Sequence, residues 1–463
     1  MSGMPLLQAL LLLASLIALI ALAQARLLHA FLAIVVVASG FGLAAGFSTA
    51  FVGKAFGSGF AQAIYSPGLV IVAAGFVAGL AEATGASGSL AARIASSTGS
   101  WRFAGATRLP ALCGLIAGLA SSPSTAFAVL TPLLRAFTGA AAPPQKRGAA
   151  PAALALAISA SHGLVLISPV PIAAASILDA PWSRVALIGA PLAVLIAGLG
   201  AAWSRWLSVA DAALPAPLPE SSAAQKGNAW SAAVLVLATA IPLALLIVQS
   251  LGDIPSEPLG GGTAREMVIG VGRPLVLLVV GVGIMAIGTA RLTGKLLADD
   301  AWNTRVLGAI AGLLLTVGAS GGLQRLCQET GMAELLGEHV GSWHVSWHLS
   351  GASGLLVIFL IAATIKTLQG SSLVAAITAA GIAQPLLIPF GLDAANARAL
   401  AALAVGAGAM TASHINDDYF WLVSVGSGIR PLRALAVLTA GTLVQGVVAL
   451  AVLMTVGALI FGR

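Results

Sequence analysis

Charged residues are scarce in this sequence. Its 463 residues include 22 Lys and Arg and 15 Asp and Glu, which is 8% of the chain, whereas 59% of the residues are hydrophobic. An ordinary soluble domain has about 25% charged residues. So few charges could not cover a soluble protein of this size, which excludes soluble enzymes, nucleic-acid binders and disordered scaffolds. The composition predicts a polytopic membrane protein, whose net charge of +7 reflects basic cytoplasmic loops rather than nucleic-acid binding.

Cysteine is almost absent, and recognisable cofactor motifs are missing. Cys113 and Cys327 have no neighbouring Cys or His at ligand spacing, so we expect neither a disulfide framework nor a thiolate metal site. His344 and His348 lie between tryptophans with no zinc-protease carboxylate, which indicates an amphipathic interfacial segment. No phosphate-binding P-loop occurs, so nucleotide hydrolysis is not the expected energy source. We therefore expect no cofactor and no metal.

Long apolar stretches account for most of the chain. A helix needs about 20 apolar residues to cross the bilayer core, and ten stretches approach that length. The first of them lacks a basic start and is followed at once by further spans, so we interpret it as a retained helix rather than a signal peptide. The predicted spans are 5–23, 30–51, 67–82, 150–178, 185–203, 230–250, 270–289, 306–322, 397–425 and 434–460.

Two further apolar stretches, 109–137 and 352–388, are interrupted by small polar residues at 121–125 and 369–372. Each arm is too short to be a comfortable span, so we interpret both stretches as re-entrant hairpins. Basic residues flank the first hairpin, whereas mostly acidic residues flank the second. Under the positive-inside rule, the two hairpins therefore enter from opposite faces of the membrane.

The two halves of the chain resemble each other. Ala-Thr-Gly-Ala at 83–86 matches Glu-Thr-Gly-Met at 329–332, and Ser-Ala-Ser-His at 159–162 matches Thr-Ala-Ser-His at 411–414. The alternative is chance similarity between Ala-rich helices. We predict an all-α inverted repeat, with five spans and one hairpin per half, which is the arrangement of secondary transporters. The predicted units are residues 1–206, a cytoplasmic linker at 207–228, and residues 229–463.

The richest polar cluster lies in the middle of the predicted span 397–425. Lipid would not tolerate so many polar groups on an intact helix, so we predict a broken helix lining a watery site. His414 and Asp417 would share a helical face and could hold a proton. The alternative is that Asp417 and its neighbour cap a helix at the membrane interface. The polar members are Ser413, His414, Asn416, Asp417 and Asp418.

Three other places are candidates for the binding site. His162 corresponds to His414 in the first half and precedes helix-breaking prolines, although it is also typical of a satisfied core histidine. The hairpin tips offer hydroxyls and helix N-termini that suit an anion, or they serve close helix packing. Lys366 either attracts a carboxylate or snorkels, and Glu82 is best read as an interfacial cap. The tip residues are Ser121, Ser122, Ser124, Thr125, Gly370, Ser371 and Ser372.

With these residues identified, the chain resembles the gluconate permease family of proton-coupled organic-anion symporters, within the ion-transporter superfamily. The most specific match runs from Gly408 to Asp417 and on to Phe420-Trp421, which is similar to the family's Ser-His-x-Asn-Asp followed by Phe-Trp. A second match begins at Gln369-Gly370-Ser371-Ser372. The resemblance implies an elevator-type carrier of the bacterial inner membrane, often a homodimer.

The chain also departs from the family pattern. Ser124 stands where an acidic residue is typical, Lys366 replaces an arginine, and residues 166–171 replace a His-containing proline-rich run. The expected function is therefore proton-coupled symport of a small hydroxylated carboxylate, such as gluconate or a related sugar acid. Its substrate-binding residues would be the tip residues with His162, Ser413, His414 and Asn416, and its proton-coupling residues His414 and Asp417.

Two other functions compete with this one. A cation/proton antiporter of the same superfamily is the alternative, because the Asp417-Asp418 pair would suit a cation. An intramembrane enzyme would need a nucleophile and base or a metal cluster at convincing spacing, and the sequence offers neither.

Overall fold

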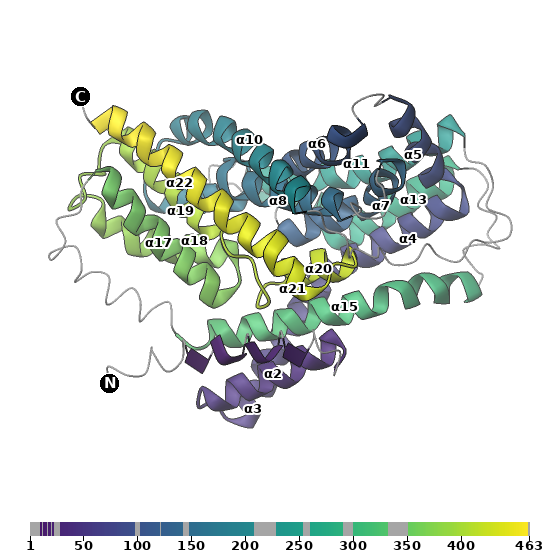
Figure 1. Ribbon diagram of the computed structural model, residues 1–463, viewed down its shortest axis with the longest axis horizontal. Helices are drawn as coiled ribbons and strands as arrows, with labels where there is room; N and C mark the ends of the chain where they lie inside the picture. Colours follow the sequence, from purple (N-terminus) through teal and green to yellow (C-terminus); the bar gives the residue numbers. More distant parts are fainter. Residues whose placement is uncertain are drawn as a thin grey trace.

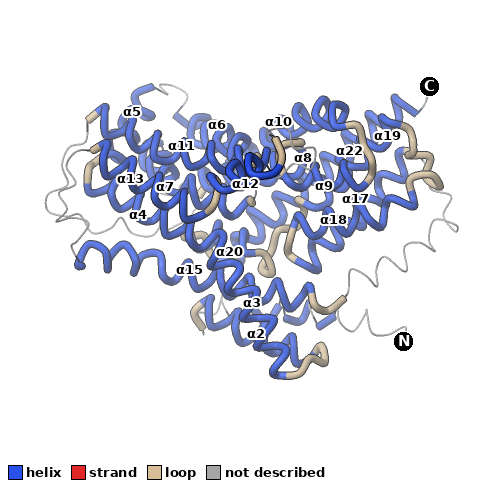
Figure 2. The backbone as a smooth tube through the Cα atoms, turned by 180° about the vertical axis from the view of Figure 1, so that it is seen from behind, coloured by secondary structure: helices blue, strands red, loops and turns tan. Residues whose placement is uncertain are grey.

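The structure is a computed structural model. It describes residues 28–461 except 98–101, 121, 142–147, 208–227, 253–259, 290–299 and 332–350, together with scattered helical residues between 10 and 22. Among these residues all regular secondary structure is helical, as Figure 2 shows. The linker 207–228 and the His344–His348 segment therefore lie almost wholly outside the described residues.

The described helices coincide with most of the predicted apolar spans. In chain order they are α2 (Ala30–Ala44), α3 (Thr49–Ala63), η1 (Ile64–Gly68), α4 (Leu69–Ala83), α5 (Ala86–Ser97), α6 (Arg102–Ala117), α7 (Pro123–Ala141), α8 (Ala149–Leu164), α9 (Pro169–Ile177), α10 (Trp182–Trp206), α11 (Ala229–Gly252), α12 (Gly262–Val271), α13 (Pro274–Gly288), α15 (Asp300–Gln328), α17 (Ala352–Gln369), α18 (Ser372–Ala383), η4 (Gln384–Leu386), α19 (Ala395–Ala409), α20 (Asp418–Gly426), α21 (Pro431–Ala434), η5 (Leu435–Thr439) and α22 (Ala440–Phe461).

Four breaks predicted from the sequence are present. The hairpin stretches each divide into two helices, α6 with α7 and α17 with α18. The predicted span 150–178 divides into α8 and α9, and α9 begins at Pro169. A proline has no backbone N–H to lose at the first helical position, so it starts a helix easily but cannot continue one. The span 397–425 divides into α19 and α20.

One predicted span has the wrong bounds. Residues 30–51 do not form a single helix, because α2 ends at Ala44 and Gly46 adopts a positive φ of 92°. The side chain of Ser48 then caps a new helix, α3, by accepting a hydrogen bond from the Phe51 amide. The polar residues of α3, among them Lys54, Ser58 and Gln62, lower its hydropathy and hid it from a search for apolar stretches.

Within the described residues, six helices are long and apolar enough to cross a membrane, or up to eight if two bent helix pairs each count as one span. One of the six is α17, whose 18 residues pass this test alone. That differs from the expectation that neither arm of the second hairpin could span. The other arm of that hairpin, α18, has only 12 residues. One of the two bent pairs is α4 with α5, which meet at an angle of 81°.

The buried apolar residues form two clusters. The first gathers α2, α4, α7, α11, α15 and α20, and the second gathers α9, α10, α17, α18, α19 and α22. Figure 1 shows α4, α7 and α11 of the first cluster towards one end of the molecule and α17, α18, α19 and α22 of the second towards the other, with α15 running beneath both sets and above α2 and α3. All residues of α8 are buried, and α8 contributes Leu154 to the first cluster and Leu164 to the second. It therefore lies between the two cores.

Candidate functional site

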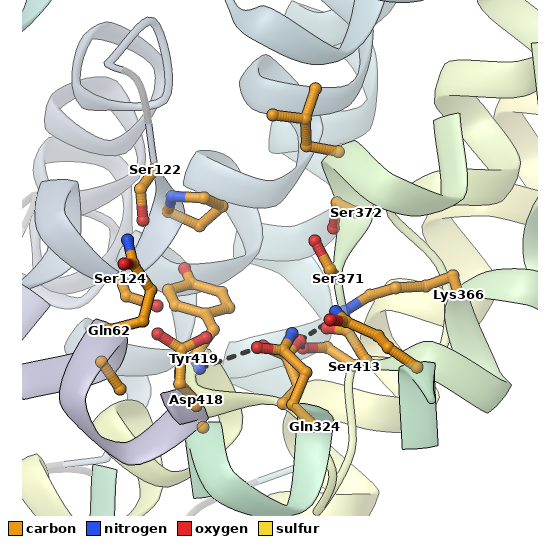
Figure 3. Close-up of a pocket in the computed structure, with 18 of the residues that line it drawn as sticks. Gln62, Ser122, Ser124, Gln324, Lys366, Ser371, Ser372, Ser413, Asp418 and Tyr419 are labelled. Carbon is orange, nitrogen blue, oxygen red and sulfur yellow. Dashed lines mark hydrogen bonds and ion pairs between the residues drawn. The ribbon is translucent and has the colours of Figure 1, made fainter. Parts of the chain in front are cut away.

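A cavity of about 490 Å³ lies where the helix breaks meet (Figure 3). It receives side chains from both hairpin tips, from α8, and from the segment between α19 and α20, while α3 and α15 supply its remaining wall. The cavity is therefore built from both halves of the sequence. Its polar lining residues are Ser58, Gln62, Ser122, Ser124, Ser159, His162, Gln324, Arg325, Gln328, Lys366, Ser371, Ser372, Ser413, Asp417, Asp418 and Tyr419.

The first hairpin tip presents the start of α7 to the cavity. Ser122 precedes Pro123 and accepts a hydrogen bond from the Thr125 amide at 3.5 Å. Ser124 is 2% exposed and lies beside the carboxyl group of Asp418. Thr125 is also buried but does not line the cavity. Ser121, the other predicted residue of this tip, lies outside the described residues.

The second tip presents the start of α18 in the same way. Gly370 ends α17 with φ 74°, and a Cβ atom there would lie 2.2 Å from the Asn416 carbonyl oxygen. Only glycine suits both the left-handed backbone and this close approach. Ser371 then caps α18 by accepting from the Val374 amide at 3.3 Å. Gly370, Ser371 and Ser372 all line the cavity, as predicted for a binding tip.

Residues 410–417 form an irregular segment between α19 and α20, and polar side chains of this segment bind backbone carbonyl groups of the second hairpin. His414 Nε2 lies 2.9 Å from the Thr367 carbonyl oxygen. The side-chain amide of Asn416 donates through Nδ2 to the same oxygen at 2.9 Å and to the Leu368 carbonyl oxygen at 3.3 Å. These carbonyls belong to the last turn of α17, which lacks intrahelical partners for them. His414 and Asn416 therefore hold the tip in place from behind and do not line the cavity.

The expected pairing of His414 with Asp417 is not present. The Asp417 amide donates to the His414 carbonyl oxygen at 2.9 Å, which forms a single turn, but the two side chains bind different partners. Asp417 instead forms an ion pair with Lys366, whose Nζ lies 2.5 Å from Oδ2. The side chains are 7% and 2% exposed, respectively, and both line the cavity. Lys366 also donates to the Gly370 carbonyl oxygen at 2.6 Å. Of the two roles left open for Lys366, attraction of a carboxylate is the one observed.

The carboxylate of Asp417 is held by two further groups. The Ser413 hydroxyl donates to Oδ2, and the Tyr419 amide donates to Oδ1 at 3.0 Å. The second bond makes Asp417 the N-cap of α20. The capping role that the sequence left as an alternative is therefore correct in part, since the same residue caps a helix and lines the cavity.

Three helix N-termini converge on this cavity. They belong to α7, α18 and α20, and their capping residues Ser122, Ser371 and Asp417 all line it. A helix N-terminus carries unpaired amides and a partial positive charge, which favours an anion nearby. The ammonium group of Lys366 adds a full positive charge. The site can therefore bind a carboxylate, and its hydroxyl groups can bind a polyol chain.

The sequence interpretation missed the wall formed by α3 and α15. Ser58 and Gln62 are four residues apart, as are Gln324 and Gln328, so each pair lies on one helical face. Arg325 completes this wall and forms an ion pair with Glu329 at 2.6 Å. This i, i+4 spacing of amide and hydroxyl residues in apolar helices was the available signal. His162, in contrast, was predicted and does line the cavity.

Comparisons with known proteins identify the family. Residues 4–460 match the family described as GntP family permease. The chain belongs to this family. It is a permease rather than an enzyme, and its helices are those of a multi-pass membrane protein.

Several relatives of this GntP family permease are curated transporters. A gluconate permease of Pseudomonas aeruginosa is 27% identical over 425 residues, which cover 89% of each chain. The high-affinity gluconate transporter of Escherichia coli is 28% identical over 314 residues, which cover 67% of this chain and 68% of that one. The Gnt-II system L-idonate transporter of Escherichia coli is 26% identical over 402 residues, covering 85% and 86%.

Among solved structures, the YdaH transporter of Alcanivorax borkumensis is similar over 89% of each chain, with 19% identity and a TM-score of 0.33.

Proposed function

We propose that this permease is a secondary active symporter that carries a small hydroxylated carboxylate together with a proton. The observation that carries the proposal is the convergence of three helix N-termini and the Lys366 ammonium on one hydroxyl-lined cavity. Helix ends and a cation favour a carboxylate, and the surrounding Ser and Gln side chains suit the hydroxyl groups of a sugar acid. Relatives named for gluconate and L-idonate transport support the same substrate class.

The size of the site agrees with such a substrate. Small-molecule pockets have volumes of about 300–1,000 Å³, and this cavity has about 490 Å³. A six-carbon acid with several hydroxyl groups fits within that volume. Asp417 is the proposed proton carrier because its carboxylate faces the cavity while remaining buried. His414, which faces carbonyl oxygens instead, would act by positioning the second tip.

The proposed architecture is an inverted repeat that works as an elevator. It is supported by reciprocal packing, since α9 of the first half packs against α18 of the second, and α20 of the second half packs against α7 of the first. Exchanging the halves turns one contact into the other, as expected for a pseudo-twofold axis. The cavity lies at this junction. Location in a bacterial inner membrane, surrounded by lipid, and assembly as a homodimer belong to the same proposal.

The alternative, a cation/proton antiporter, rests on the two carboxyl groups of Asp417 and Asp418 in the cavity. A cation would have to displace Lys366 from Asp417, and it would face three positive helix ends. The geometry therefore favours an anion over a metal cation.

Transport by the purified protein in proteoliposomes tests these proposals. We expect an inward proton gradient to drive accumulation of radiolabelled gluconate or L-idonate, and unlabelled sugar acid to drive counterflow. Proton release driven by Na⁺, without carboxylate uptake, would establish the antiporter instead. Carboxylate uptake that requires Na⁺ and ignores the proton gradient would retain the substrate class and overturn the proton coupling.

A further inference from the structure

The ion pair between Lys366 and Asp417 is the most deeply buried charged contact in the described part of the chain. Burying a charge is costly unless it is paired, and an unpaired charge left behind costs more than the pair contributes. An ammonium group has three N–H donors. Two of those of Lys366 are accounted for by Asp417 and the Gly370 carbonyl oxygen, and the residue borders the cavity. Its ammonium can therefore meet a ligand from the cavity side.

Resting on the proposed function, we propose that Lys366 binds the substrate carboxylate and that the substrate takes the place of Asp417 as its counter-ion. Asp417 accepts the transported proton and becomes neutral, which releases Lys366. The substrate carboxylate then pairs with the ammonium. On the other side of the membrane the substrate leaves, Asp417 loses its proton, and the original ion pair forms again.

Charge balance at this pair explains why the two cargoes move together. In the empty carrier, Lys366 and ionised Asp417 sum to zero. In the loaded carrier, Lys366, neutral Asp417 and the carboxylate also sum to zero. A carrier holding only the proton would have an uncompensated positive charge, and one holding only the substrate an uncompensated negative charge. Since both half-loaded forms bury a net charge, they should cross the membrane poorly. The exchange therefore predicts one proton per monocarboxylate.

The groups that hold Asp417 suit both of its protonation states. Ionised Asp417 accepts hydrogen bonds from the Ser413 hydroxyl and the Tyr419 amide. Neutral Asp417 can keep the amide bond at Oδ1 and donate its new proton to the Ser413 oxygen, because a hydroxyl group is both donor and acceptor. The carboxyl group of Asp417 therefore keeps its hydrogen-bond partners after Lys366 has paired with the substrate.

Other titratable groups border the cavity near this pair. Asp418, the first residue of α20, lies beside Ser124 and beside the carboxyl group of Asp417. Arg325 on α15 is paired with Glu329. His162 on α8 borders the cavity, and His414 faces the Thr367 carbonyl oxygen. Within the described residues, Lys366 is the cation bound directly to Asp417.

Binding to purified variants tests the exchange. Removing Lys366 from the wild type would leave the Asp417 carboxylate buried and unpaired, whereas removing it from Asp417→Asn leaves no carboxylate stranded. The informative comparison is therefore between Asp417→Asn and the double variant Lys366→Gln/Asp417→Asn, which differ only in the ammonium group. Lys54→Gln and Asp179→Asn make the same chemical changes at exposed positions away from the cavity and serve as matched controls.

We expect the gluconate affinity of the wild type to fall by about tenfold per pH unit as the pH is raised, because binding takes up a proton. Asp417→Asn should bind with an affinity independent of pH. The double variant should bind at least about tenfold more weakly than Asp417→Asn, as expected for loss of a charge-assisted hydrogen bond. Both controls should follow the wild type.

The possible failures are distinguishable. A wild type that binds no sugar acid overturns the proposed function and this exchange with it. A wild type that binds gluconate, combined with a double variant that matches Asp417→Asn in affinity, overturns only the role of Lys366. Affinity of Asp417→Asn that still falls with pH in the wild-type manner assigns the proton to another group and overturns the exchange.

Discussion

The two hairpins and the broken helices beside them have the same framework but different chemistry. In each half a hairpin tip exposes a capped helix start, at Ser122 or Ser371, and a neighbouring helix is broken close to a histidine. The two hairpin stretches can be aligned so that Ser124 in the first tip corresponds to Ser372 in the second. In this alignment Gly118 corresponds to Lys366. The first half therefore has no side chain where the second has an ammonium group.

The broken helices differ in the same way. The alignment of His162 with His414 pairs Val165 with Asp417, so the first half has an apolar side chain where the second has the carboxylate. Gly118 cannot simply be replaced by lysine, because a Cβ atom there would lie 2.6 Å from the Ile158 carbonyl oxygen. Under the proposed mechanism, one half mainly shapes the cavity by close packing, while the other also carries the coupling chemistry through its ion pair.

The largest expected effect is a loss of stability when a glycine beside a hairpin tip is replaced, and the loss should be greater at the second tip than at the first. Gly370→Ala forces a side chain into a left-handed conformation and against the Asn416 carbonyl, so it should destabilise the protein by about 3 kcal/mol or more and abolish transport. Gly118→Ala meets a tight contact without a positive φ and should cost about 1–3 kcal/mol. Thermal unfolding in detergent compares them, and equal stability of Gly370→Ala and wild type would contradict the packing of the second tip.

Asp417→Asn should remove gradient-driven accumulation while preserving counterflow. The empty variant leaves Lys366 charged and unpaired, so the carrier returns poorly without substrate, whereas the loaded variant is neutral. Val165→Asn, the corresponding change in the first half, should keep its coupling to the proton gradient. The measurement is uptake under a pH gradient beside counterflow in the same vesicles. Full accumulation by Asp417→Asn would move the proton site elsewhere, with Asp418→Asn as the next variant to measure.

The histidines should matter for position rather than for coupling. His414→Gln weakens the contact with the Thr367 carbonyl oxygen and should cost about 1 kcal/mol of stability, while accumulation still depends on the proton gradient. His162→Gln should raise the substrate concentration needed for half-maximal uptake, because His162 borders the cavity. Loss of proton-driven accumulation in His414→Gln, with counterflow intact, would restore His414 as the proton carrier.

The smallest expected effects concern the capping hydroxyls. Ser122→Ala and Ser371→Ala each remove a helix cap and a polar group of the cavity, so each should cost about 1 kcal/mol and weaken substrate binding by a few fold. Similar losses in both variants would support a shared framework. An effect confined to Ser371→Ala would indicate that the substrate contacts the second tip alone.

Local signals were sufficient for the helix breaks and for much of the cavity. Small polar residues within apolar stretches predicted both hairpin tips, and Pro169 predicted the start of α9. The partner of Lys366 was not predictable in this way, because Asp417 is 51 residues away and meets it only after folding. The expected His414–Asp417 pair assumed helical spacing in a segment that is not helical. The wall from α3 was missed because hydropathy ranks Ser58 and Gln62 as interruptions of a span.

The exchange of partners at Lys366 is tested most directly by counting the protons that accompany substrate binding. Titration calorimetry of gluconate binding in two buffers with different ionisation enthalpies gives this number, because each proton taken up is drawn from the buffer. The wild type, in which Asp417 is paired with Lys366 before binding, should take up about one proton per carboxylate bound, and Asp417→Asn should take up none. Binding to the wild type without proton uptake, or the same uptake in both proteins, would contradict the exchange.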